Sequence, residues 1–506
     1  MIRLLLLLLY AFFFSLCAFG SDWPQFKRTS NRQGCNLNET VQLPSTLCLW
    51  VNFGSPVEAS PIIANNKAYA ISSQGILACV DLANAAILWH KPLSGIGNVS
   101  APATENDTVW VATQSGMLYV IRGSDGTIIN SFNTGSSILA DLLLLPTGIY
   151  VGAINGIFYA FDRGGNLKWS YQADQAIVHA ACEKEGQIVF TDGDQHAIWL
   201  ADSGASYHEI RNVSIKTLGP SICSFMPPMI WNDTIFFAKG EVELLTDFTG
   251  VFKFGFNTGS MIGRITSSIS RACLSVDTAD GVLFIGSTRN GLFVLGAPRN
   301  WNTTDYYSDY PFDGIYGVNS SPAVIGNCVI FGSECGKINF FSKTSSTTFG
   351  GTSLWSYMPS SGKAISASPA VSNGRVVIGA TDGCLYGFWN GTEVTEPTDI
   401  SDSTSTRGDV SRIPAPGTWT LFVSPNPSAT GNIVIAAQGI ETGYAIVLYD
   451  VQGRIIKEWR NNGPKMQRIV WNRSDAAGHT VPSGTYFAVM KNRSGMKVQK
   501  FKIVIM

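Results

Sequence analysis

One stretch of this sequence brings metal-binding residue types close together: TDGDQH, residues 191–196. Asp192, Asp194 and His196 fall within five residues there, and carboxylate and imidazole groups bind divalent cations. The same stretch also suits a tight hairpin turn, because Asp and Gly favour the backbone angles of such turns. The sequence therefore predicts a turn, and a cation site stays the alternative.

Elsewhere the spacing of reactive residues predicts no catalysis. The histidines form no HxH or HExxH pair, and neither a GxSxG nor a GxxxxGK[ST] motif occurs. The net charge of −1 provides no overall field that would attract nucleic acid. We therefore predict no catalytic, cofactor-binding or metal-ligating residue, no cofactor and no nucleic-acid partner. The five histidines are His90, His179, His196, His208 and His479.

Apart from Cys17, nine cysteines are scattered along the chain without a CxxC pair, so zinc-ribbon and c-type haem sites have no support. Isolated cysteines on strands are commonly buried as small apolar residues. Two close pairs, Cys35 with Cys48 and Cys328 with Cys335, also allow local disulfides, and both interpretations stay open at this point. The remaining cysteines are Cys79, Cys182, Cys223, Cys273 and Cys384.

The first twenty residues predict a secretory signal peptide. Arg3 provides the positive end and residues 4–14 the apolar run, and small residues precede a cut ahead of Ser21. Leu16, directly before Cys17, disfavours a lipid-bearing cysteine. No later apolar run reaches the ~18 residues that a membrane helix needs. We expect a mature chain without a transmembrane segment that is extracellular or attached to a bacterial cell surface.

A repeated unit organises residues 21–393. It joins a small-residue or Ser-Pro step to two β-rich runs separated by turns, as in SPIIANNKAYAISSQGILACVD (60–81) and SPAVSNGRVVIGATDGCLYGF (368–388). Eight copies lie about 40 to 48 residues apart. Four short strands at this period are typical of a β-propeller blade, and blades arranged in a ring cover each other's faces. The sequence predicts an all-β chain with an eight-bladed propeller.

Tryptophans recur in the last strand of several units, as Trp89, Trp169 and Trp355. Because they recur at one place in the repeat, we interpret them as packing between blades and not as ligand-stacking residues. The eighth unit, which ends near Trp389, lacks this strand. A strand of the missing type, TLCLWVNF (46–53) with Trp50, precedes the first unit. We predict that it completes the eighth blade and closes the ring.

Two stretches resemble a known family. SDWPQFKRTSNRQG (21–34) resembles the opening of secreted quinoprotein-like (PQQ-like) repeat proteins, and LACVDLANAAILW (77–89) resembles their repeat, with Asp81 eight residues before Trp89. The resemblance covers about residues 21–393. It implies a propeller, and some members hold pyrroloquinoline quinone on the ring axis with calcium, typically under a disulfide between adjacent cysteines. This sequence has no Cys-Cys pair.

The tail divides into a linker and a second domain. Residues 394–416 are rich in Ser, Thr, Asp and Pro, and predict a linker. Residues 417–506 contain six or seven short strands, which predict a small β-sandwich. Asn426-Pro427, Asp450, Gly453-Arg454 and Gly484-Thr485-Tyr486 are similar to motifs of C-terminal type IX secretion sorting domains and of the immunoglobulin-like fold of flagellar hook-capping proteins.

The sequence thus predicts a secreted or cell-surface, non-catalytic propeller that is exported through residues 417–506 by the type IX machinery. Binding in propellers lies in loops that vary between units, here 211–228 and the aromatic-rich 296–317. The expected partner is a protein or a glycan. Two alternatives remain: a PQQ-dependent quinoprotein oxidoreductase, and an envelope assembly scaffold like the outer-membrane β-barrel assembly lipoprotein built from the same repeat.

Overall fold

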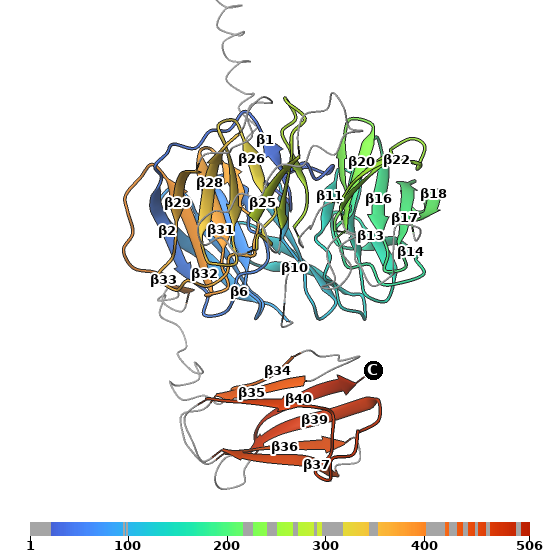
Figure 1. Ribbon diagram of the computed structural model, residues 1–506, viewed down its shortest axis with the longest axis vertical. Coiled ribbons are helices and arrows are strands. Elements are labelled where there is room, and N and C mark those ends of the chain that lie inside the picture. The colour runs from blue at the N-terminus through green and yellow to red at the C-terminus, as the bar shows by residue number, and fades with distance from the viewer. Residues whose placement is uncertain are drawn as a thin grey trace, which may run out of the picture. The chain divides into compact units, whose positions relative to one another are not determined.

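The computed structural model divides the chain into two units, Met1–Ser405 and Thr406–Met506. Every element named in either unit is a β-strand (Figure 1). The predicted signal peptide lies outside the described residues, among which no helix is long and apolar enough to cross a membrane. The description covers 22–505 except 95–96, 98–99, 216–225, 240–249, 267–271, 288–290, 296–316, 344–352, 401–419, 425–432, 439–443, 451–453, 462–465 and 492–496.

In the described part of the first unit, the strands form eight consecutive sheets, which we call blades 1 to 8. Blades 1 to 4 have four strands each: β3 (Ile62–Ala64), β4 (Lys67–Ile71), β5 (Ile76–Asp81) and β6 (Ala86–Pro92); β7 (Ala103–Glu105), β8 (Thr108–Ala112), β9 (Met117–Arg122) and β10 (Ile128–Asn133); β11 (Leu143–Leu145), β12 (Gly148–Gly152), β13 (Ile157–Phe161) and β14 (Leu167–Gln172); β15 (Cys182–Lys184), β16 (Gln187–Thr191), β17 (His196–Asp202) and β18 (Tyr207–Ser214).

Blades 5 to 8 complete the ring. Their strands are β19 (Met229–Trp231), β20 (Thr234–Lys239), β21 (Gly250–Gly255) and β22 (Met261–Thr266); β23 (Ser275–Val276), β24 (Leu283–Ser287) and β25 (Gly291–Leu295); β26 (Ala323–Ile325), β27 (Cys328–Gly332), β28 (Ile338–Ser342) and β29 (Ser353–Tyr357), with β1 (Cys35–Asn36) beside β26; and β30 (Ala370–Ser372), β31 (Arg375–Gly379), β32 (Cys384–Trp389), β2 (Thr46–Asn52) and β33 (Thr398–Asp399). The all-β fold and the eight blades are as the sequence predicts.

Burial within a blade follows from its place in the ring. In blade 3, strands β11 and β12 are buried along their whole lengths, whereas the last strand, β14, alternates between buried and exposed residues. First strands of neighbouring blades contact one another, as β3 does with β7 on one side and with β30 on the other, so they lie at the centre. Apolar side chains fill the space between blades, as where Phe158 of blade 3 stacks on Phe190 of blade 4 at 4.1 Å.

The recurring tryptophans join neighbouring blades. The indole nitrogen of Trp89 in blade 1 donates a hydrogen bond of 2.8 Å to the carbonyl oxygen of Gly123 in blade 2. The indole nitrogen of Trp169 in blade 3 donates a hydrogen bond of 2.8 Å to the carboxylate of Asp202 in blade 4. Trp355 of blade 7 packs edge-on against a ring of blade 8, with 5.6 Å between the centroids. The prediction of packing between blades is confirmed.

The ring closes through the strand before the first unit. Strand β2 pairs antiparallel with β32 of blade 8, and Trp50 is opposite Tyr386. The predicted closing strand is therefore confirmed. The structure adds β33, which pairs in parallel with β2, and Ile400 directly after it is 5% exposed in the ring core. The first residues of the stretch predicted as a linker therefore pack against the ring.

The second unit contains two antiparallel sheets. Side chains from both share one core, which includes Leu448 from one sheet and Trp471 from the other. An immunoglobulin-like fold stays a prediction. The sheets are β34 (Thr420–Ser424), β35 (Ile433–Gln438) and β38 (Met466–Trp471), and β37 (Ile455–Asn461), β36 (Tyr444–Asp450), β39 (Gly484–Lys491) and β40 (Lys497–Ile505).

The two local disulfides are absent, because all eight described cysteines are free. Cys35 lies in β1, beside the first strand of blade 7, while Cys48 lies in β2 of blade 8, where its thiol donates to the carbonyl oxygen of Trp389. Cys328 and Cys335 lie at the start of β27 and beyond its end, so an extended strand separates them. These thiols behave as small residues in a packed ring. Cys223 lies outside the described residues.

Ring closure predicts a large loss of stability for Leu49→Ala. Leu49 is 1% exposed in β2, and a Cβ added at Gly387 of β32 would lie 2.7 Å from the Leu49 Cβ. Truncation of a buried Leu costs about 2–5 kcal/mol. The matched change Leu88→Ala, on a side chain 45% exposed, should cost under ~1 kcal/mol. Denaturant unfolding measures both, and equal losses would show that β2 does not hold the ring closed.

Candidate functional site

The N-terminal segment, residues 22–39, runs around the inside of the ring. Trp23 exchanges two backbone hydrogen bonds with Ile63 of blade 1 (2.7 and 2.9 Å), and the carboxylate of Glu39 accepts the backbone N–H groups of Asn373 (3.0 Å) and Gly374 (2.9 Å) in blade 8. In each of blades 2 to 7, one backbone N–H of the first strand donates a hydrogen bond to an oxygen of the segment. In chain order these bonds are Thr104 N to Pro24 O (2.8 Å), Leu144 N to Gln25 Oε1 (3.0 Å), Glu183 N to Ser30 O (2.9 Å), Ile230 N to Asn31 O (2.9 Å), Val276 N to Gln33 O (3.1 Å) and Val324 N to Gly34 O (2.9 Å).

This segment was missed by sequence reasoning, which placed it before the ring. It has no periodicity, and its bonds reach partners 40 to more than 300 residues away along the chain. The physical reason for its position is the first strand of each blade. Its inner edge faces the axis, where buried N–H groups need acceptors. The segment supplies an acceptor to every blade.

Phe26 occupies the centre of the ring. It is 6% exposed and forms one apolar cluster with Ala101, Ala180 and Cys273, which come from blades 2, 4 and 6. Only a side chain near the axis can contact three blades that are not neighbours. At the level of these residues, the channel is filled with protein.

Two buried basic side chains hold the segment in place. Lys27 donates to the hydroxyl of Ser275 and to the carbonyl oxygen of Pro322 (3.3 Å). Burial lowers the pKa of Lys27 to about 7. The Arg32 guanidinium donates to three backbone carbonyl oxygens, of Ala181 (2.9 Å), Leu142 (2.7 Å) and Phe26 (2.5 Å), and its pKa is lowered to about 10 by burial.

The Ser-Pro step of the repeat has a structural use at the same level. The hydroxyl of Ser60 in blade 1 accepts the backbone N–H of Ser368 in blade 8 (3.0 Å). The Ser368 hydroxyl accepts from Ser321 N, and the Ser321 hydroxyl from Cys273 N (both 2.9 Å). The carboxylate of Asp141 in the same way accepts the backbone N–H of Ala101 (2.6 Å), and burial raises the pKa of Asp141 to about 6. The step links the starts of neighbouring blades.

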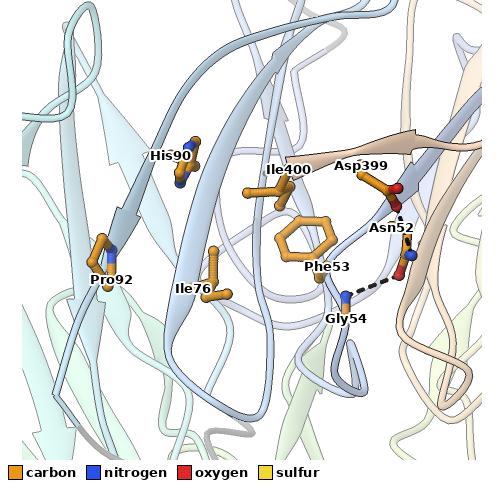
Figure 2. A pocket seen from close by; sticks show the side chains of 8 residues that line it. All are labelled: Asn52, Phe53, Gly54, Ile76, His90, Pro92, Asp399 and Ile400. Carbon is orange, nitrogen blue, oxygen red and sulfur yellow. Dashed lines mark hydrogen bonds between the residues drawn. The ribbon is translucent and has the colours of Figure 1, made fainter. Parts of the chain in front are cut away.

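A pocket of about 500 Å³ lies beside the closing strand, between blades 8 and 1 (Figure 2). Its wall is mostly apolar, and Asn52 bridges Asp399 (2.8 Å) and Gly54 N (2.9 Å) at one side. His90 lines the pocket, its pKa is lowered by burial, and its Nε2 has no hydrogen-bond partner among the described residues. The other lining residues are Phe53, Ile76, Pro92 and Ile400.

The structure brings the residues of TDGDQH to a turn, as expected, and adds a further carboxylate. Asp194 and His196 lie beside Asp174, which the sequence analysis did not single out, and their possible metal-binding atoms all lie within 4.8 Å of one another. Asp174 comes from the connection between β14 and β15, which passes over the turn. No local spacing could have indicated this residue.

The predicted variable loops lie largely outside the described residues, which exclude 216–225 and 296–316. Within the first loop, residues 211–214 belong to strand β18, and Met226 is buried.

Comparison with known proteins agrees with this geometry. The family model for the outer membrane protein assembly factor BamB, a set of PQQ-type repeats, matches residues 51–132 and 97–295. Residues 51–295 of the ring thus match PQQ-like repeats. No curated protein has a sequence that matches the chain.

Solved structures similar to the chain share the repeat's propeller fold. The quinohemoprotein alcohol dehydrogenase of Comamonas testosteroni aligns with 76% of this chain and 83% of its own (TM-score 0.57, 12% identity). A europium-containing methanol dehydrogenase aligns with 74% and 99% (TM-score 0.55, 11% identity). The computationally designed protein Ika8 aligns with 68% and 99% (TM-score 0.55, 16% identity). At these identities the likeness establishes the fold alone.

The PQQ-like repeats raise the question of whether the axis fits a quinone with calcium. At the level of Phe26, an apolar side chain and the buried basic side chains of Lys27 and Arg32 occupy the channel. Asp141, a buried carboxylate beside Arg32, already accepts the backbone N–H of Ala101. This part of the axis does not fit the quinone and its metal.

The buried Lys27 predicts a pH-dependent stability. Its pKa is 10.5 unfolded and about 7 in the ring, so between these values the unfolded chain binds more protons. Stability should therefore rise with pH over this range, by at most ~1.4 kcal/mol per unit. Lys27→Met should flatten the rise, whereas Lys363→Met, at an exposed lysine, should not. Unfolding free energies at pH 7 to 10 test this, and parallel profiles for wild type and Lys27→Met would contradict it.

Proposed function

We propose that this chain is a non-catalytic binding propeller, exported to the bacterial cell surface or beyond, whose ligand is a protein or a glycan. The observation that carries the proposal is the axial segment. Phe26, Lys27 and Arg32 occupy the centre of the ring, where a catalytic cofactor would need an open cavity. Binding is then left to the faces and seams of the ring.

The pocket between blades 8 and 1 is the docking site that the described residues favour. Phe53, Ile76 and Ile400 give it an apolar wall, and Asn52 and Asp399 add polar groups at its side. An apolar wall with polar groups at its side suits a peptide segment, whose apolar side chain would enter the pocket while its backbone bonds to the polar groups. A segment of a partner protein is therefore favoured over a glycan.

Two alternatives keep specific support. The BamB family model names an assembly factor of the outer membrane, which is consistent with an envelope scaffold that binds other proteins. Both dehydrogenases among the similar structures are consistent with an oxidoreductase. Against the second alternative stand the filled axis and the lack of an adjacent cysteine pair in the sequence.

Binding by the purified protein tests the proposal. We expect a surface-protein fraction from the source cell, or a glycan array, to yield one saturable ligand. His90→Ala in the pocket should weaken its binding about tenfold or more, whereas Ile129→Ala, on an exposed side chain of β10, should not. Reconstitution with pyrroloquinoline quinone and calcium should give no dye reduction with alcohols or sugars. Turnover in that assay, without any saturable ligand, would replace this proposal with the oxidoreductase.

The second unit is proposed to be the export signal. The described residues of its sorting-domain motifs lie close together around the hairpin β36–β37 and strand β39. Asp450 accepts the backbone N–H of Arg454 (2.9 Å) and its guanidinium (2.6 Å), which closes the hairpin β36–β37. Asp450 also lies opposite Tyr486, whose hydroxyl donates to the carbonyl oxygen of Pro482 (2.7 Å). Asn426-Pro427 lies outside the described residues.

Deletion of residues 417–506 should stop export in a host with type IX secretion. The separate core of this unit predicts that the ring folds without it. The truncated protein should accumulate in the cell envelope, and immunoblots of cell fractions and medium would measure it. As a control, residues 417–506 fused to a signal peptide and a reporter should reach the surface. Undiminished release of the truncated protein would give the tail another role.

A further inference from the structure

The turn between the second and third strands is built alike in several blades. In blades 1, 2 and 7 it opens with Ser72, Thr113 and Ser333. Each hydroxyl accepts the backbone N–H of the residue four positions later, at 3.3, 3.3 and 3.1 Å. These turns use at most one side-chain oxygen at this place, and blades 3 and 8 form the same backbone turn with Ala153 and Ala380 there.

Blade 4 has a carboxylate there. The Oδ1 atom of Asp192 accepts the backbone N–H groups of Asp194 (3.1 Å) and His196 (2.8 Å), which satisfies the turn. Its Oδ2 atom is not needed for the turn. It lies 3.4 Å from the Nδ1 atom of His196 on a side chain with 0% exposure.

Neither Asp192 Oδ2 nor His196 Nδ1 has a hydrogen-bond partner among the described residues, although both are buried. A buried carboxylate oxygen without a partner is costly, and native proteins usually provide one. Two such atoms that face each other point to a ligand that binds both.

Two more carboxylates meet the same histidine. Asp174 Oδ2 lies 3.4 Å from His196 Nδ1, and metal-binding atoms of Asp174, Asp194 and His196 lie within 4.8 Å of one another. A backbone hydrogen bond from Gly193 to Ala176 (2.8 Å) holds the two loops together. The Asp174 side chain is 68% exposed, so an ion can enter from solvent.

The second unit contains the same local turn without these surroundings. Asp475 Oδ1 accepts the N–H of His479 (2.9 Å), and its Oδ2 lies 3.5 Å from His479 Nδ1. The His479 side chain is 82% exposed, and among the described residues no third possible ligand joins this pair. Turn geometry alone therefore makes no site. Blade 4 differs by its burial and by the two added carboxylates.

We infer that blade 4 binds one divalent transition-metal ion, with Zn²⁺ as the best match, through the clustered His196 Nδ1 and carboxylate oxygens of Asp174 and Asp194. The buried Asp192 Oδ2 lies outside that cluster but only 3.4 Å from His196 Nδ1, and it would complete the ligand set. One imidazole with carboxylates is a nitrogen and oxygen set that suits zinc, whereas calcium prefers oxygen ligands throughout. The ion would join the β14–β15 connection to the turn of blade 4. This site is independent of the proposed binding function.

Titration calorimetry of the full-length, chelator-treated protein with zinc chloride tests the inference. We expect one ion per chain, and a calcium affinity at least ~10-fold weaker. Asp192→Ser keeps the single oxygen that blades 1 and 7 use for this turn, so it should preserve the fold yet weaken zinc binding by at least ~10-fold. His196→Gln should do the same.

The matched controls are Asp475→Ser and His479→Gln, which should leave the isotherm unchanged. Cobalt(II) replacement adds a spectroscopic readout, because binding by the free cysteines would give strong thiolate absorption and binding in blade 4 would not. Unfolding curves establish that each variant is folded. The inference is overturned by a wild-type protein that takes up no zinc, by uptake that survives in both blade 4 variants, or by a thiolate spectrum.

Discussion

The first strand of each blade lies next to the axis. The backbone N–H and C=O groups on its inner edge have no further strand of the blade to pair with. An unpaired buried N–H costs about as much as a lost hydrogen bond. Residues 22–39 provide acceptors for the first strands of blades 1 to 7 and, in blade 8, for the turn that follows β30. The segment is therefore part of the ring's core, and its buried Lys27 and Arg32 are held there by carbonyl oxygens.

The same part of the chain closes the ring at its outside. After the axial segment, β2 crosses to the far side of blade 8 and pairs with β32, more than 300 residues later in the sequence. The N-terminal residues thus bind blade 8 twice, through Glu39 next to the axis and through β2 at the outer side. Contacts of such sequence separation carry the entropic cost of closing a long loop, which slows folding. Ring closure and filling of the axis both use residues 22–52.

Sequence reasoning succeeded where periodicity carries the signal. The repeat predicted the eight blades, and the missing strand after Trp389 predicted the pairing of Trp50. It failed where a contact has no period. The axial segment binds backbone groups, which leave no trace in side-chain pattern. Cys35 and Cys48 are near in sequence but lie on different blades, and Asp174 reaches its neighbours from the preceding blade. β33 is two residues long, too short for any pattern to show.

The repeat also gives a means of separating structural from functional groups. The residue at each repeat position makes certain hydrogen bonds within its turn, and the other blades show which of these bonds the turn uses. In the corresponding turn of blade 8, Ala380 stands where blade 4 has Asp192. The carboxylate of that turn, Asp382, lies two positions later and has both oxygens engaged: Oδ1 accepts Cys384 N (2.9 Å), and Oδ2 accepts the hydroxyls of Tyr386 (2.7 Å) and Ser361 (2.6 Å). At Asp192 the turn engages one oxygen and leaves the other buried beside a histidine. A group that exceeds its structural task and is still buried without a partner is the stronger indication of a ligand, and it becomes visible only when the blades are compared.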